Sequence, residues 1–276
     1  MKHRSEAQEL AFIGMAKRGA QRTSGVIPAE ELIAEAIRRH GDKLVVSWSG
    51  GRCSTVVLFM ALKIDPNIKA FFNDMGGAEM PETIRFVRET APKYHINLTI
   101  VTPEQTIWEV FRKYGYPKPR RVADPARGIK AERTPKCCDL IKEKPLIKAK
   151  REAGIEAELT GLRASEAHVR MMSAAQKGMF YFHKKHRVWR YNPIIFWTTR
   201  ETVDFIKNND IPDNPAYLKY DLDRTGCWPC TAYRGWQENM ARINPKFYTY
   251  LTKQLGPQRI LEHFYQTRVA PCSERG

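Results

Sequence analysis

The chain has 276 residues, with 46 Lys and Arg against 30 Asp and Glu, and a net charge of +16 at neutral pH. Hydrophobic residues make up 42% of the chain, which is enough for a packed core and argues against global disorder. No apolar run approaches the roughly 20 residues of a membrane helix, and the basic N-terminus lacks the apolar stretch of a secretory signal. We therefore expect a cytoplasmic protein with an anionic partner, built as one large domain or one domain with a small appendage.

Helical patterns alternate with short apolar strands along most of the chain. The predicted elements are a helix at 28–37, a strand at 43–48, a helix at 54–63, a strand at 68–72, a helix at 81–90 that begins with proline, strands at 98–101 and 158–160, and a helix at 199–208 capped by Thr198 or Thr199. This alternation predicts βαβ units. The expected fold class is therefore α/β, with a mostly parallel, twisted sheet that carries helices on both faces.

Two basic stretches interrupt the alternation. Residues 112–136 carry nine Lys or Arg, two acids and four prolines, which predicts a basic surface loop. Residues 177–190 carry basic side chains and no acid, interleaved with Phe180, Tyr181 and Trp189. The second stretch is interpreted either as a charged face with one strand of aromatic core or as a nucleic-acid surface, where basic groups meet phosphates and aromatic rings stack on bases. Both stretches are candidate contacts for a nucleic acid.

A glycine-rich turn follows the strand at 43–48 and leads into the next helix. Gly50 and Gly51 allow a tight turn that exposes backbone N–H groups to an anion, and the helix adds the positive end of its dipole. The candidate anion-binding residues are Ser47, Ser49, Gly50, Gly51, Arg52 and Ser54. An ordinary tight turn between a strand and a helix is the alternative interpretation.

Cysteines form the strongest constellation in the sequence. The six are Cys53, Cys137, Cys138, Cys227, Cys230 and Cys272. A large domain with no export signal disfavours a disulfide framework, so the adjacent pair and the Cys-Trp-Pro-Cys turn are better interpreted as metal ligands or redox groups. Four thiolates suit either tetrahedral zinc or a four-iron cluster, and spacing alone would favour zinc.

The order of several motifs resembles the phosphoadenosine-phosphosulfate (PAPS) and adenosine-phosphosulfate (APS) reductase family, within the PP-loop adenine-nucleotide alpha-hydrolase superfamily. The resemblance runs from about residue 44 to 231. Its motifs are Ser-Gly-Gly-Arg-Cys-Ser at 49–54, Gly-Ala-Glu-Met-Pro-Glu-Thr at 77–83, Cys-Cys-Asp-Leu-Ile-Lys-Glu-Lys-Pro-Leu at 137–146, Thr-Gly-Leu-Arg at 160–163, Asn-Pro-Ile-Ile-Phe-Trp-Thr at 192–198, Ile-Pro-Asp-Asn-Pro at 211–215 and Gly-Cys-Trp-Pro-Cys-Thr at 226–231.

This resemblance implies a Rossmann-like fold and assigns roles to particular residues. The ligands of a [4Fe-4S] cluster would be Cys137, Cys138, Cys227 and Cys230, with zinc as the less favoured occupant. The basic side chain near the cluster would be that of Lys142. The residues that bind the adenine nucleotide (PAPS, APS or ATP) would be the glycine loop with Asp74, Gly161, Arg163 and Arg170. Each arginine could instead pair with a core carboxylate.

Two departures from the family pattern concern the loop and the acid after the second strand. The usual loop aspartate is replaced by Cys53, which puts metal-assisted ATP cleavage in doubt. A cysteine at this place is either reactive, because a helix N-terminus lowers the pKa of a thiol, or a small packing residue. The spacing of Asp74 differs by one residue from that of the family's acid.

The resemblance also implies a reaction and a domain organisation. Family reductases attack the sulfonyl sulfur with a tail cysteine and release sulfite with a thioredoxin-like thiol, so Cys272 is the candidate nucleophile. The usual tail motif is missing, and an incidental thiol is the alternative. We expect a basic extension at 1–27, the PP-loop domain with the cluster site at 28–235, and a C-terminal helix with a mobile tail at 236–276. A homodimer is a further candidate assembly.

The sequence is also compatible with two other functions. An ATP-dependent iron–sulfur sulfurtransferase that thiolates tRNA or DNA would use the same loop, cysteines and basic stretches. A nucleotide-binding subunit without activity of its own, within a larger complex, is the non-enzymatic alternative.

Overall fold

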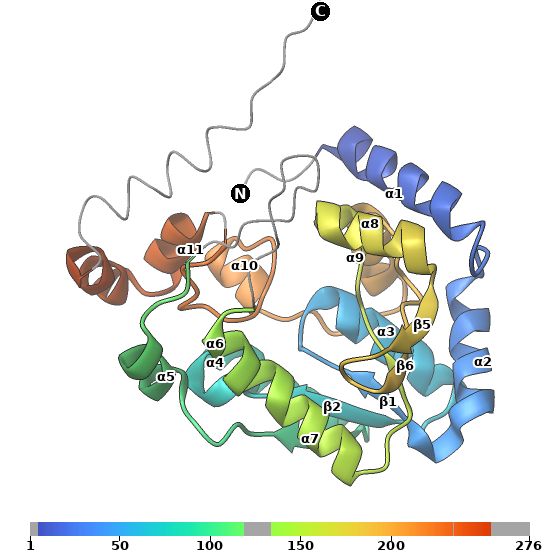
Figure 1. The fold of residues 1–276 in the computed structure, drawn as a ribbon, viewed down its shortest axis with the longest axis horizontal. Coiled ribbons are helices and arrows are strands. Elements are labelled where there is room, and N and C mark those ends of the chain that lie inside the picture. The colour runs from blue at the N-terminus through green and yellow to red at the C-terminus, as the bar shows by residue number, and fades with distance from the viewer. Residues whose placement is uncertain (1–4, 119–133, 234, 255–276) are drawn as a thin grey trace, which may run out of the picture.

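A computed structural model describes residues 5–118, 134–233 and 235–254. One six-stranded sheet forms the centre, in the order β3-β2-β1-β4-β6-β5 (Figure 1). Its strands are β1 (Leu44–Ser47), β2 (Lys69–Asn73), β3 (Asn97–Val101), β4 (Ala157–Leu159), β5 (Phe180–His183) and β6 (Val188–Tyr191). All neighbouring strands are parallel except β5, which pairs antiparallel with β6. The predicted α/β class with a mostly parallel sheet is confirmed.

Helices and short turns connect these strands. The helices are α1 (Glu6–Ala20), α2 (Ala29–His40), α3 (Arg52–Ile64), α4 (Pro81–Lys93), α5 (Ile107–Tyr114), α6 (Lys136–Cys138), α7 (Lys144–Glu152), α8 (His168–Lys177), α9 (Thr199–Asn208), α10 (Ala216–Tyr220) and α11 (Trp236–Ile243). The turns are η1 (Gly41–Lys43), η2 (Met75–Gly77), η5 (Ala164–Glu166) and the π-helical turn η4 (Asp139–Glu143). Residues 245–254 are also helical. Among the described residues, no helix is long and apolar enough to cross a membrane.

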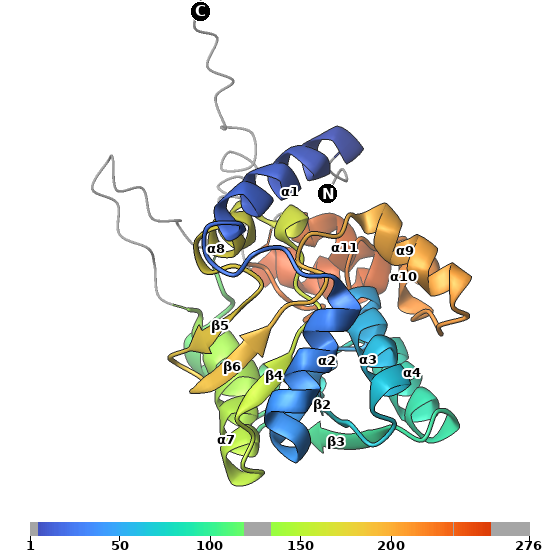
Figure 2. The ribbon, with the colours of Figure 1, turned by 90° about the vertical axis from the view of Figure 1, so that its right-hand side faces the viewer.

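The central strands β1 and β2 carry apolar side chains on both faces of the sheet, and helices cover both faces. Val46 and Phe72 belong to the large core cluster that includes residues of α2, α3 and α4. Their neighbours Val45 and Phe71 belong to a separate cluster, against which Leu146 of α7 packs. Figure 2 shows α7 on one side of the sheet and α2 with α3 on the other. Successive side chains of a strand therefore pack into two apolar layers, one on each face of the sheet, as expected for a parallel sheet.

A buried charged group also lies on the α7 face of the sheet. Lys150 of α7 and Glu158 of β4 form an ion pair although each is at most 2% exposed. The Arg190 guanidinium binds the other oxygen of the Glu158 carboxylate at 2.6 Å. Burial alone would raise the pKa of Glu158, but Lys150 and Arg190 together hold that pKa well below its usual range. These groups stabilise the fold only as a complete set.

The first helix packs onto the body of the protein. Ile13, Ala16 and Ala20 of α1 lie in the large core cluster. A side chain at Gly19 would come within 2.5 Å of the backbone oxygen of Ala175 in α8, so the two helices touch closely at this point. Figure 1 shows α1 lying next to α8 at the top of the view.

Two local predictions from the basic stretches were wrong. Residues 177–190 contain two strands joined as an antiparallel hairpin, rather than one strand. Residues 112–114 are the last residues of α5 rather than part of a loop, because Thr106 and Glu109 form a capping box that starts this helix. Residues 119–133 lie outside the described residues.

Candidate functional site

The glycine loop runs from the end of β1 into α3, as predicted. Gly50 has a φ of +69°, and a Cβ there would lie 2.7 Å from Thr83 of α4, so only glycine fits without strain. The Asn214 side-chain amide donates to the Gly50 carbonyl and to the Thr83 hydroxyl, both at 2.9 Å. The loop is therefore held by residues from two of the other motifs, at 77–83 and 211–215.

The serines of the loop already bond to one another. The Ser49 N–H donates to the Ser54 hydroxyl at 3.1 Å, and the two hydroxyl oxygens lie 3.0 Å apart. Ser54 also donates to the carbonyl of Gly51 at 2.9 Å. These contacts shape the turn around the first residues of α3, where the helix dipole favours an anion. The N–H of Arg52, the first residue of α3, donates to the Tyr217 hydroxyl at 3.2 Å.

Ser47, Arg52 and Asp74 have partners within the protein. The hydroxyl of Ser47 donates to Glu158 at 2.8 Å, so it belongs to the buried charged group. The guanidinium of Arg52 binds Asp213 and lies over the ring of Tyr217 at 4.2 Å. Asp74 accepts bonds from the Gly76 N–H and the Thr102 hydroxyl, each at 3.0 Å. Their assignment to nucleotide binding stays a prediction.

Gly161 brings the loop after β4 against the start of α3. A Cβ at this position would lie 2.5 Å from the backbone of Cys53 and Ser54. This contact explains why a glycine precedes Arg163 by two residues in the motif. It also directs the following turn, η5, toward the anion-binding end of α3.

Arg163 is buried between the loop and the N-terminal helix. Its Nε–H donates to the Cys53 sulfur at 3.2 Å, and its Nη1 donates to the Thr199 hydroxyl at 3.1 Å. The same Thr199 is bound by Glu9 of α1, whose carboxylate lies 3.9 Å from the guanidinium. Cys53, which replaces the usual loop aspartate, thus contacts an arginine.

Arg170 continues this cationic row toward the cysteines. It forms an ion pair with Glu166, which also lies 3.7 Å from Arg163. Partial burial lowers the pKa of Arg170, and the nearby charge of Arg224 lowers it further, since a like charge disfavours the protonated form. Arg224 lies over the Tyr233 ring at 4.6 Å and is also close enough to Cys230 to lower the pKa of its thiol.

The four predicted cysteine ligands come together from two segments. Cys137 hydrogen bonds to Cys138 and Cys227 to Cys230, and the two pairs lie within electrostatic reach of each other. The hydrogen bond from Cys227 lowers the pKa of Cys230 to about 6, with help from Arg224 and Lys142. Hydrogen bonding and burial raise the pKa values of Cys137 and Cys227.

Local structure explains how neighbouring cysteines can face the same centre. The pair 137–138 lies in the short helix α6, which passes directly into the π-helical turn η4. Such turns recur at functional sites because they redirect side chains within a helix. In the other segment, the Trp228 N–H donates to the carbonyl of Ala78, the residue after η2, at 3.0 Å, which fixes the Cys-x-x-Cys turn to this part of the chain.

Lys142 lies at the end of this redirected segment. Its charge acts on both Cys230 and Glu79. Glu79 is only 4% exposed, and this burial raises the pKa of its carboxyl to about 8, against the smaller opposing effects of the Met80 N–H and Lys142. A carboxyl group that is mostly protonated at neutral pH therefore lies beside the cysteines.

Sequence reasoning missed several contributors to the site. Glu9 is 154 positions before Arg163 in the chain, and its contact depends on how α1 packs. Glu166 and Arg224 lie next to motif residues, so proximity to the motifs was an available signal. Glu79 stands inside a motif, but its burial could not be predicted from the motif. Cys272 lies outside the described residues.

The fold and site together define an α/β protein with a glycine-rich loop between β1 and α3 and four cysteines brought together from two segments. The family model described as "Phosphoadenosine phosphosulfate reductase domain" matches residues 43–233. The chain therefore belongs to the phosphoadenosine phosphosulfate reductase family, a family of oxidoreductases.

Similar proteins agree with this membership. The chain is 29% identical over 207 residues to the phosphoadenosine 5'-phosphosulfate reductase of Gloeobacter violaceus, covering 74% of this chain and 78% of the relative. It is 29% identical over 206 residues to the adenosine 5'-phosphosulfate reductase of Staphylococcus haemolyticus, covering 74% and 76%. A crystal structure of PAPS reductase from Candida auris in a phosphate complex shares the fold, with a TM-score of 0.54, 20% identity, and coverage of 73% of this chain and 89% of that chain.

Proposed function

We propose that this protein is a sulfonucleotide reductase that binds PAPS or APS and releases sulfite, with a [4Fe-4S] cluster and a thiol reductant. The observation that carries the proposal is the row of Arg163, Arg170 and Arg224, which leads from the glycine loop to the cysteines. The phosphosulfate group of the substrate carries several negative charges, and guanidinium groups bind tetrahedral anions in this way.

Substrate binding would use the loop and the arginines together. The N–H groups at the start of α3 would bind one anionic group of the phosphosulfate. Glu166 now occupies both arginines, so we expect the substrate to displace this carboxylate from Arg170, which is 40% exposed. The more deeply buried Arg163 would then hold the anion with Cys53 and Thr199 at its sides.

The four cysteines fit an iron–sulfur cluster by their chemistry and their arrangement. The donor set consists of four thiols, none of them in a disulfide, which form two pairs that approach from α6 and from the Cys-x-x-Cys turn. Four thiolates suit either a tetrahedral zinc ion or a four-iron cluster by their chemistry, and metal analysis distinguishes the two. When bound, the cluster would supply local charge and redox character beside the substrate.

The reaction requires a thiolate, for which Cys272 is the proposed source. The thiolate attacks the sulfonyl sulfur, the bond from that sulfur to the phosphate oxygen breaks, and the adenine nucleotide leaves. The S-sulfocysteine is then reduced by a dithiol such as a thioredoxin, which supplies two electrons, becomes a disulfide and releases sulfite. The cation at Lys142 would stabilise the negative charge that develops on the leaving phosphate.

A turnover assay tests this proposal. Anaerobically purified protein is given APS or PAPS with thioredoxin, and sulfite is measured. We expect sulfite from at least one nucleotide, loss of turnover in Cys272→Ser, and a fall in kcat of about a hundredfold in Lys142→Ala. No sulfite from either nucleotide, in a sample that contains the cluster, would contradict the reductase proposal.

One observation keeps a second candidate function open. The β5–β6 hairpin exposes Phe182 and Trp189, and Lys177 lies over the ring of Tyr181 at 4.7 Å. Exposed aromatic rings among cations are suited to nucleic acid, as an ATP-dependent sulfurtransferase would require. Release of pyrophosphate from ATP that increases on addition of tRNA or single-stranded DNA would favour this function, and no release of pyrophosphate would exclude it.

A further inference from the structure

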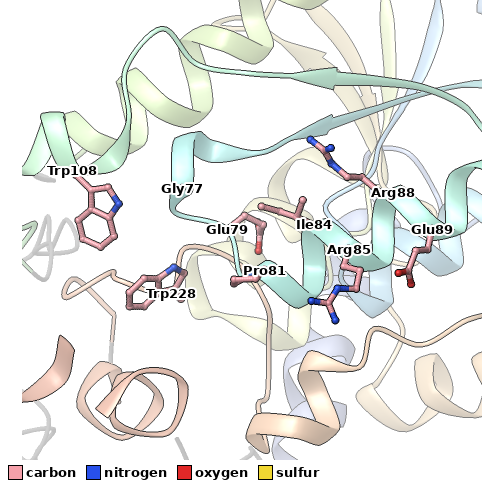
Figure 3. Close-up of a pocket in the computed structure, with 9 residues that line it drawn as sticks. All are labelled: Gly77, Glu79, Pro81, Ile84, Arg85, Arg88, Glu89, Trp108 and Trp228. Atoms are coloured by element: carbon pink, nitrogen blue, oxygen red, sulfur yellow. The ribbon is translucent and has the colours of Figure 1, made fainter. Parts of the chain in front are cut away.

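A second concave site lies on the outer side of the Cys-x-x-Cys turn, away from the glycine loop. It is an open pocket of about 640 Å³, within the size range of small-molecule sites. Figure 3 shows Trp108 and Trp228 on one side, Arg85 and Arg88 of α4 on the other, and Glu79 between them.

The two tryptophans offer a stacking surface. Their rings meet edge to face, with centroids 5.8 Å apart, and both also contact Phe247 at 5.3 Å. This packing holds the rings in place, yet Trp108 remains 37% exposed. Gly77 lies close by, and a Cβ there would be 3.6 Å from the Trp108 indole nitrogen. A rigid, partly exposed indole of this kind is suited to bind a planar heterocycle.

The opposite wall carries cations that the protein does not neutralise. Arg85 and Arg88 are one helical turn apart on α4, and neither makes an ion pair or hydrogen bond within the described residues. The nearby ion pair between Lys219 and Glu82 uses a different acid. Glu89 also lines the pocket but is not bonded to either arginine. Two free guanidinium groups beside a stacking surface favour a phosphate as the second part of the ligand.

The floor of the pocket carries a buried polar group. Glu79 is only 4% exposed, and one oxygen of its carboxyl group accepts a hydrogen bond from the Met80 N–H at 3.2 Å. A carboxyl group in this position can bond to the ring nitrogen or amino group at the edge of a base. Planar, polar-edged and phosphorylated ligands combine these three features.

We propose that this pocket binds a nucleotide, with its base against Trp108 and Trp228 and its phosphate on Arg85 or Arg88, whose guanidinium groups leave α4 in different directions (Figure 3). The site is distinct from the adenine-nucleotide site of the proposed reductase, and it does not depend on that function. The ligand is either a free nucleotide or a nucleotide residue of a single-stranded nucleic acid. Both present the same chemistry to the pocket, and the experiment distinguishes them.

The test measures equilibrium binding of two probes at about 0.15 M salt. The first is a fluorescein-labelled ten-nucleotide single strand, followed by anisotropy. The second is free CMP, followed by calorimetry, because its pyrimidine base is unlike the adenine expected at the reductase site. The pocket variants are Trp108→Ala and the double variant Arg85→Ala/Arg88→Ala. The control, Arg38→Ala/Arg39→Ala, removes the same charge from the exposed face of α2.

We expect affinity to fall about tenfold in both pocket variants and less than twofold in the control. This pattern for the strand identifies nucleic acid as the ligand, and the same pattern for CMP identifies a free nucleotide. Failure of both probes to bind, or equal binding by pocket and control variants, would overturn the proposal. The arginine variant alters only surface side chains, so it tests the pocket even if Trp108→Ala does not fold.

Discussion

The substitution Gly161→Ala tests whether the loop after β4 must lie directly against the start of α3. The added Cβ would lie 2.5 Å from backbone atoms of Cys53 and Ser54, whereas ordinary contact begins at 3.4 Å. The two segments would therefore have to separate by about 0.9 Å, the difference between these distances. Backbone atoms cannot rotate away as a side chain can, so we expect a cost of about 1–3 kcal/mol in the free energy of unfolding.

The same separation should also weaken nucleotide binding, because it moves Arg163 away from the glycine loop. Urea unfolding and calorimetric titration with PAPS or APS measure the two effects. The matched control is Gly14→Ala in α1, where the nearest atom would be 3.7 Å away and alanine favours the helix. The reasoning is refuted if Gly161→Ala unfolds within about 0.5 kcal/mol of wild type and binds nucleotide equally well.

Three other predictions follow from the buried groups and the cysteines. Lys150→Met leaves Glu158 buried with only Arg190 as its cationic partner, so urea unfolding should show a loss of about 3 kcal/mol; a loss below about 1 kcal/mol would contradict this. The pKa of Glu79 is raised to about 8 in the folded state, so the wild type should lose stability as pH rises from about 5 to about 8, because the unfolded carboxyl releases its proton first. Glu79→Gln should therefore gain on wild type by up to about 1.4 kcal/mol per pH unit in that range, and parallel pH curves would refute the assignment. Cys227→Ser should lose most of its bound iron, whereas Cys53→Ser should keep it; equal iron in both variants would contradict the ligand assignment.

Local signals were sufficient to predict most of the sheet and its helices. The strand Leu44–Ser47 and the helix Arg52–Ile64 lie within three residues of their predicted bounds. Thr198 caps α9 with a complete capping box, as one of the two predicted caps. These features depend on neighbours within a few positions, where hydrophobic periodicity and capping chemistry act directly.

The hairpin β5–β6 could not be predicted in the same way. Val188–Tyr191 becomes a strand because it pairs with β4, whose register places Trp189 opposite Ala157. That partner lies about 30 residues earlier in the chain, and tertiary pairing of this kind decides strand formation more than local preference does. The start of α5, by contrast, could have been predicted from the sequence. Thr106 and Glu109 have the spacing of a capping box, which marks the first turn of a helix.

At the site, the chemistry of the motifs was more predictable than the partners of their residues. The convergence of the four cysteines follows from the motif pattern. The contact between Arg163 and Cys53 depends on the fold, as do the approach of Glu9 and the burial of Glu79. Burial and contacts with distant residues determine the charge of these groups, and a sequence motif reveals neither of them.

Anaerobic purification followed by analysis of iron, sulfide and zinc, with APS and PAPS turnover on the same sample, tests the central claim most directly. We predict about four irons and four sulfides per chain, together with release of sulfite. Zinc without iron would contradict the proposed cluster, and iron without sulfite would contradict the proposed reductase.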